Sequence, residues 1–243
     1  MEVKYRFDDP QHIHLLDGQP LFGTSTVIKE IMPPFLAKWG ATCAVDHIKL
    51  GINKDGMLDK FERLEEAVLA WSKVRQTAAD KGTDAHEELE KYVKACIENG
   101  APMQIPGKDA VAKFSEWAVK NVEIFIASEV HTYHKELWVG GIVDGVVKLK
   151  TGQLAVLDFK ASGTYFNQFV QCAGYSLQLE ESGYGNADGS NWRPVEGKIE
   201  ALVVFPYERG KPEIITNVEG FKDAFRHMAL VYPMLLAFNR RNK

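Results

Sequence analysis

The segment that most constrains the fold of this chain runs from Leu137 to Lys160. Two runs rich in valine, isoleucine and leucine flank the tripeptide Lys150–Gly152, and each run carries one aspartate. A three-residue loop with glycine in the left-handed conformation is a common connection between hairpin strands. Both runs are apolar on both of their faces, which is typical of central strands that helices cover on each side. The sequence therefore predicts an antiparallel pair of buried central strands.

The two aspartates of this hairpin are expected to face each other. With the predicted loop, Leu149 lies opposite Gln153, and counting outward places Asp144 opposite Asp158. Carboxylates on adjacent strands repel each other, so at least one of the two should have a raised pKa when no metal is bound. Lys160 points to the same face as Asp158, about 6–7 Å further along the strand. An acidic pair with a neighbouring lysine is suited to binding a divalent cation.

These residues carry a resemblance to a known superfamily. Asp144 followed by Asp158-Phe159-Lys160 resembles the core motif of the PD-(D/E)xK nucleases. A histidine upstream, in the segment Gly82–His86, and a Gln-x-x-x-Tyr motif downstream, in Gln171–Tyr175, are similar to motifs of the RecB-type exonuclease branch. A D-x-K tripeptide alone occurs by chance in many chains, but four motifs in the right order are a strong signal.

Two further segments resemble the mitochondrial genome maintenance exonucleases and their phage relatives. They are the strand with Ser128 and Glu129 that leads to Asp144, and, more weakly, the pair Ser25-Thr26. In the phage-type relatives a Ser/Thr pair at this place lies near the path of the DNA. We therefore expect these residues to support the site or to contact the substrate.

The resemblance implies a fold, a cofactor and a set of site residues. The fold would be α/β, with a central mixed β-sheet flanked by helices as in restriction endonucleases. The cofactor would be Mg²⁺ or Mn²⁺, because hard oxygen ligands favour these ions and no thiolate is positioned for zinc. The implied metal ligands are His86, Asp144, Asp158 and the backbone carbonyl of Phe159. The implied catalytic residues are Asp144, Asp158, Lys160 and Glu129. The implied substrate-binding residues are Gln171, Tyr175, Ser25 and Thr26.

Each motif outside the hairpin also has a purely structural alternative. A single helical histidine such as His86 is more often structural or solvated, and only the acids and lysine further along the chain favour a ligand. Glu129 is otherwise a surface acid of an edge strand, and Ser25 or Thr26 is otherwise a helix N-cap. Tyr175 is otherwise a core residue with a satisfied hydroxyl group.

Composition limits the class of protein. With 243 residues and a net charge of −4, the chain has no global basic field, so phosphate binding would depend on local lysines and bound metal. Three scattered cysteines without CxxC spacing favour free thiols in a reducing, cytoplasmic compartment and no iron–sulfur cluster. No segment approaches the roughly 20 apolar residues of a membrane span. Four aromatic residues are candidates for base stacking, each with packing as the alternative: Trp39, Trp138, Tyr165 and Phe166.

The remaining elements follow from periodicity and turn residues. We expect one nuclease domain over residues 1–243, with a helical N-terminal region at 1–81 and the nuclease core at 82–243. Residues 1–23 should be irregular with a short strand, and 182–197 a long loop. Helices are expected at 25–31, 58–81, 85–97, 108–120, 166–180 and 221–238, an amphipathic segment at 35–52, and further strands at 122–133, 199–207 and 213–216.

The sequence thus predicts a metal-dependent DNA exonuclease of DNA recombination, repair or replication. The resemblance alone implies that it acts on single strands or ends. It also implies a bacterial or phage-infected cell as the setting and a phage or host recombination or replication protein as a partner. One alternative is a structure-specific or restriction-type endonuclease on the same core. Another is a non-catalytic DNA-binding subunit of a recombination complex, which an intact set of Asp144, Asp158 and Lys160 does not favour.

Overall fold

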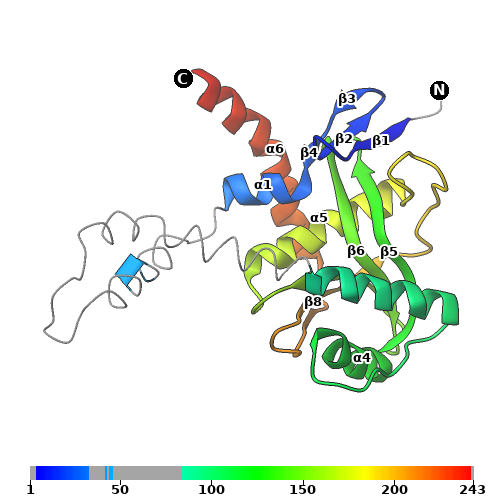
Figure 1. Ribbon diagram of the computed structural model, residues 1–243. Coiled ribbons are helices and arrows are strands. Elements are labelled where there is room, and N and C mark those ends of the chain that lie inside the picture. The colour runs from blue at the N-terminus through cyan, green and yellow to red at the C-terminus, as the bar shows by residue number, and fades with distance from the viewer. Residues whose placement is uncertain (1–3, 33–41, 43, 46–83, 242–243) are drawn as a thin grey trace, which may run out of the picture. The chain divides into compact units, whose positions relative to one another are not determined.

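The computed structural model describes residues 4–32, 42, 44–45 and 84–241 (Figure 1). The chain divides into two compact units, one formed by Met1–Met32 with His86–Lys243 and the other by Pro33–Ala85. Nearly all of the second unit, including the segments expected at 35–52 and 58–81, lies outside the described residues. The architecture below is that of the first unit.

A mixed six-stranded sheet forms the centre of this unit, as predicted. The antiparallel strands β5 (Val122–His134), β6 (Val139–Leu149) and β7 (Leu154–Lys160) are followed by β8 (Ile199–Pro206), which lies parallel to β7. The short strand β9 (Glu213–Ile215) pairs antiparallel with β8, and β4 (Phe22–Gly23) pairs parallel with β6. The fold is therefore α/β in class, and its central sheet contains both parallel and antiparallel strand pairs.

The β6–β7 hairpin has the predicted register. Leu149 donates its backbone N–H to Gln153 O at 2.9 Å, and Gly152 has a φ of +90°. The paired residues run from Lys148 with Leu154 to Gly145 with Leu157. Continuing this register places Asp144 opposite Asp158, one step beyond the last pair.

Helices cover both faces of the sheet. α5 (Phe166–Ser182) packs on the face that carries Val146, Val156 and Val204. Because side chains alternate along a strand, Phe159 and Phe205 project from the opposite face. There they pack against Phe114 of α4 (Ala110–Asn121), with ring centroids 4.9 Å apart in each case. A further helix at 84–99 contributes its apolar residues to the same layer.

Two helices complete the described unit. α1 (Thr24–Ile31) and α6 (Glu219–Arg241) share an apolar cluster with α5, and α6 extends away from the sheet toward the C-terminus (Figure 1). None of the described helices combines the length and apolar character needed to cross a membrane.

The N-terminal segment differs from the expected helical region. Three short strands, β1 (Tyr5–Asp8), β2 (Ile13–Leu16) and β3 (Gln19–Pro20), form a small antiparallel sheet, and β4 joins this segment to the central sheet. The expectation of irregular structure with one short strand missed the other strands, because strands of two to four residues are too short to give a periodic signal.

The start of α1 also corrects a prediction. Neither Ser25 nor Thr26 is the N-cap, because the helix begins at Thr24 and Gly23 is the cap residue, without a side-chain cap bond. Thr24 instead donates its hydroxyl to Gly140 O at 3.0 Å, which fixes the first turn of α1 against β6.

Candidate metal centre and its cleft

The site lies where the pairing along one edge of β6 is interrupted. β5 occupies the other edge of this strand. On the open edge, β7 pairs as far as Gly145, and β4 pairs with Val139 and Gly140. Among the described residues, no strand pairs with this edge between Gly141 and Asp144. The two strands that flank this interval leave room for side chains to converge.

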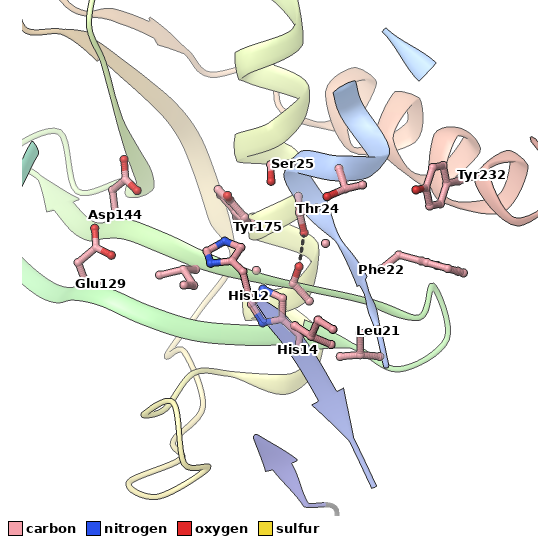
Figure 2. A pocket seen from close by; sticks show the side chains of 16 residues that line it. His12, His14, Leu21, Phe22, Thr24, Ser25, Glu129, Asp144, Tyr175 and Tyr232 are labelled. Atoms are coloured by element: carbon pink, nitrogen blue, oxygen red, sulfur yellow. Dashed lines mark hydrogen bonds between the residues drawn. The ribbon is translucent and has the colours of Figure 1, made fainter. Parts of the chain in front are cut away.

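A cleft of about 390 Å³ opens at this interruption (Figure 2). In this view Glu129 and Asp144 lie on the left, and the first turn of α1 lies near the middle. Tyr175 of α5 forms part of the wall between them, beside Gly141. A Cβ atom at position 141 would lie 2.5 Å from the Tyr175 ring, so glycine is required for this close approach.

Three carboxylates occupy facing positions on three neighbouring strands. In the β5–β6 register, Ser128 pairs with Gly145 and Val130 with Val143, so Glu129 lies opposite Asp144. The β6–β7 register places Asp158 on the other side of Asp144. Glu129 has a φ of +50°, a left-handed conformation that costs a non-glycine residue about 1–3 kcal/mol. Such backbone strain in the middle of a strand is common at functional sites.

His86 completes a group of possible metal ligands. It lies in the first turn of the helix at 84–99, with Nε2 3.2 Å from Asp144 Oδ2 and Nδ1 3.7 Å from Glu129 Oε1. One ligand atom from each of His86, Glu129 and Asp144 can be chosen so that all three lie within 4.8 Å of one another. The Phe159 ring packs edge-on against the imidazole, at 5.7 Å between centroids, and helps to orient it.

The charged groups of this cluster change one another's pKa values. The hydrogen bond to Asp144 raises the pKa of His86 to about 9, although burial acts in the opposite direction. Burial raises the pKa of Glu129 to about 8, and the charge of Asp144 adds to this effect. Burial also acts to raise the pKa of Asp144, but the hydrogen bond from His86 and the charge of Lys160 outweigh it, so that pKa is lowered. In the metal-free protein an imidazolium therefore separates the acids, and a metal ion would have to displace its proton.

Asp158 and Lys160 form an ion pair beside this group. Lys160 Nζ lies 2.5 Å from Asp158 Oδ2, which confirms that the two side chains share a face. Asp158 is only 1% exposed, and burial raises its pKa to about 6 despite the lysine. The pKa of one facing aspartate is thus raised, as expected, but the main cause is burial and the charge of Asp144 only adds to it. The pKa of Asp144 is lowered instead, mainly by the hydrogen bond from His86 and the charge of Lys160, with a smaller contribution from the Phe159 backbone N–H, which Asp144 Oδ2 accepts at 2.7 Å.

The structure distributes the expected ligands differently from the resemblance. His86 and Asp144 do meet, but the third member of the group is Glu129, whereas Asp158 is engaged by Lys160. Phe159 is tied to Asp144 through its N–H, and the role of its carbonyl as a ligand stays a prediction.

The expected substrate-binding residues lie on the same cleft or next to it. Ser25, Thr26 and Tyr175 line the cleft, and Gln171 donates to the Tyr175 hydroxyl at 2.7 Å, as their spacing of four on one helix face allows. The sequence did not single out Thr24 and Gln178, which form a buried hydrogen bond of 2.6 Å between α1 and α5. His12 and His14 were also missed, because His12 lies in a turn and the strand of His14 is too short to reveal which side chains face the site.

The donor set fits a divalent cation that prefers oxygen and nitrogen ligands. Two carboxylates and one imidazole suit Mn²⁺ better than Mg²⁺, because imidazole is a softer ligand than Mg²⁺ prefers. Opposite ligands around an ion with bonds of about 2.1 Å are about 4.2 Å apart. The observed span of up to 4.8 Å requires only a small contraction to reach that geometry.

Comparisons of this chain with protein-family models and with curated proteins find no match.

Proposed function

We propose that this protein is a metal-dependent deoxyribonuclease that hydrolyses phosphodiester bonds from the ends of single-stranded DNA during recombination, repair or replication. One observation carries the proposal: His86, Glu129 and Asp144 converge at an open cleft, beside the Asp158–Lys160 ion pair. The combination of a group of possible metal ligands and an adjacent half-buried lysine is suited to the charge that develops on a phosphate under attack. The preference for ends and single strands comes from the motif resemblance.

The residues of the candidate metal centre and its neighbouring ion pair have distinct roles in this proposal. His86, Glu129 and Asp144 would hold Mn²⁺ or Mg²⁺, which when bound lowers the pKa of a water molecule and polarises the phosphate. Lys160 supplies a fixed positive charge next to Asp144, and Asp158 keeps it in place. Asp158 is in this view a positioning residue first, and a metal ligand only if its contact with Lys160 is broken.

The part of the cleft beside α1 is suited to a neighbouring phosphate of the DNA strand. The first turn of α1 has no side-chain cap bond, so backbone N–H groups and the hydroxyls of Ser25 and Thr26 are available there. Tyr175 lies between this turn and the acids, where it would contact the backbone that joins two phosphates. We further propose a cytoplasmic setting, in keeping with the free, buried thiols of Cys96 and Cys172.

The test uses purified protein with linear single-stranded, linear double-stranded and closed circular DNA, each with Mn²⁺, Mg²⁺ or EDTA. We expect metal-dependent degradation that requires an end, with losses of about 10²-fold or more in Lys160→Ala and Glu129→Gln. Asp223→Asn, which alters an exposed pair with Arg226, is the matched control and should retain activity.

Each other outcome has a defined meaning. Rapid cleavage of closed circles would favour an endonuclease. DNA binding without any cleavage, by folded protein in both metals, would favour a non-catalytic DNA-binding subunit. Undiminished activity in Glu129→Gln and Lys160→Ala would show that the cleft is not the active site.

A further inference from the structure

A second groove lies between α4 and the turn that joins β8 to β9. Its volume is about 430 Å³. The side chains that define it are Lys113, Glu116, Trp117, Lys120, Arg209 and Lys211. None of these residues belongs to the candidate metal centre.

The groove concentrates positive charge on a chain that is acidic as a whole. Four cationic side chains line it together with one acid, Glu116, whose carboxylate already pairs with Lys120 at 2.7 Å. Arg209 and Lys211 are exposed and have no ion-pair partner among the described residues. The turn itself carries the exposed acid Glu208, whose backbone carbonyl accepts a hydrogen bond from Lys113 Nζ at 2.7 Å, and Glu213 beyond it accepts the Thr164 hydroxyl at 2.5 Å. Against a net charge of −4, this local excess of cations is suited to an anionic partner.

The groove is also lined by an aromatic side chain, Trp117. Lys113, Trp117 and Lys120 are four and three residues apart, so they share one face of α4. The half-buried Trp117 ring stacks on Phe114, at 5.7 Å between centroids and an interplanar angle of 26°. Cations that flank a rigid aromatic surface match a single nucleic-acid strand, whose phosphates pair with the cations while an unpaired base stacks on the ring. The bases of a duplex are not available for such stacking.

The groove begins next to the catalytic end of the sheet. β7 and β8 are parallel, and Lys160 pairs with Pro206, so the turn after β8 leaves the sheet beside Lys160. Tyr207 donates its backbone N–H to Lys160 O at 2.9 Å, which holds the two segments together. The same turn carries Arg209 and Lys211 into the groove.

Two exposed aromatic residues lie shortly after Lys160 in the chain. Tyr165 and Phe166, which follow the loop after Lys160, are 59% and 55% exposed. A Cβ on Gly163 would lie 3.4 Å from the Tyr165 hydroxyl and 3.6 Å from the Arg209 guanidinium carbon, so the tyrosine and the arginine are neighbours. Tyr165 therefore lies beside Arg209 at the edge of the groove, on the loop that follows Lys160.

We infer that this groove binds the part of a single-stranded DNA substrate that lies outside the active site. The strand would leave the metal centre past Lys160, pass over Tyr165 and Phe166, and place phosphates on Arg209 and Lys211 with a base on Trp117. The identity of the ligand as DNA rests on the proposed function, whereas the groove itself does not.

The test measures binding without cleavage. A fluorescently labelled single strand of deoxythymidines is titrated with protein in EDTA at several salt concentrations. Arg209→Gln combined with Lys211→Gln should weaken binding about tenfold and reduce the slope of log K against log salt by about 1.4, which is about 0.7 for each lost phosphate contact. The matched control is Lys148→Gln combined with Lys198→Gln, which removes the same charge from another cleft where Glu196 and Glu200 balance the lysines.

The outcomes separate this inference from the proposed function. Unchanged affinity and slope in the groove variant would overturn the inference, as would an equal loss in the control variant, since that would reflect net charge alone. An equal loss for a duplex of the same length would show that the groove does not select single strands. If the groove variant loses single-strand binding while the original protein cleaves no DNA, the groove binds single strands but the protein is not a nuclease. If the original protein cleaves DNA and the groove variant binds single strands as well as the original does, the nuclease proposal is supported and the groove inference is wrong.

Discussion

His14 and His131 both contact the hydroxyl of Tyr5, with Oη to Nδ1 distances of 2.5 and 3.1 Å. Burial lowers the pKa of His14 to about 3 and also lowers the pKa of His131. In the unfolded chain a histidine has a pKa of about 6.5. Below pH 6.5 the unfolded state therefore binds more protons than the folded state, and stability must fall as the pH decreases from 6.5 toward 3.

This linkage gives a prediction for single residues. Between pH 7 and pH 5 in EDTA, His14 should reduce the free energy of unfolding by about 2 kcal/mol, because its protonation favours the unfolded chain. In His14→Gln, whose amide can still bond the Tyr5 hydroxyl, the loss over this range should be smaller by about that amount. Urea unfolding at both pH values measures the difference. His227→Gln, at an exposed histidine, should behave like the original protein; equal losses in all three proteins would contradict the prediction.

The carboxylate of Glu180 joins two helices and a strand. Glu180 of α5 accepts the Ile199 N–H at the start of β8 at 2.7 Å and pairs with Lys222 of α6 at 2.8 Å. Lys222 is only 2% exposed, so its charge depends on this partner and on Glu219 at 3.3 Å. Because α5 carries Tyr175, this contact also stabilises the wall of the cleft.

We expect Lys222→Ala to destabilise the protein by about 3 kcal/mol, because it leaves a cavity and an unpaired, partly buried carboxylate. Lys222→Met combined with Glu180→Gln should cost less, since the volume is kept and no unpaired charge remains. Urea unfolding at pH 7 compares the two variants. Lys91→Ala, which breaks an exposed pair with Glu88, should change stability by less than about 1 kcal/mol. A Lys222→Ala effect as small as this control would show that the ion pair does not hold the helices.

At the scale of the whole molecule, the metal proposal predicts linkage between cation binding and folding. A ligand present at 100 to 1,000 times its Kd stabilises the folded state by roughly 2.7–4.1 kcal/mol. Thermal melting with saturating Mn²⁺ should therefore occur at a clearly higher temperature than in EDTA. Glu129→Gln should lose most of this increase because it removes one of the three ligands.

The control for the metal experiment is Glu123→Gln, at a surface acid that pairs with Lys148, and it should keep the full increase in melting temperature. The metal-centre prediction fails if Mn²⁺ does not raise the melting temperature of the original protein. It also fails if Glu129→Gln gains as much from Mn²⁺ as the control does.

Much of the central sheet could be predicted from the sequence. The hairpin register followed from alternation and from one glycine turn, and with it the facing positions of Asp144 and Asp158. The contact between Gln171 and Tyr175 followed from the helical repeat, because residues four apart share a face. These features are local: they depend on spacing along one or two neighbouring elements, and the chain specifies spacing directly.

Other features of the site were decided only by the tertiary structure. Glu129 joins His86 and Asp144 because the backbone at Glu129 is left-handed, which no spacing rule predicts for a residue within a strand. The cleft exists because β7 leaves β6 before β4 meets it, and α1 lies there through the bond of Thr24 to Gly140, 116 residues away. The basic groove likewise combines α4 with a turn almost 100 residues later. Such features depend on contacts between distant segments, whose free energies are set by packing and solvent exclusion and not by the local pattern of the chain.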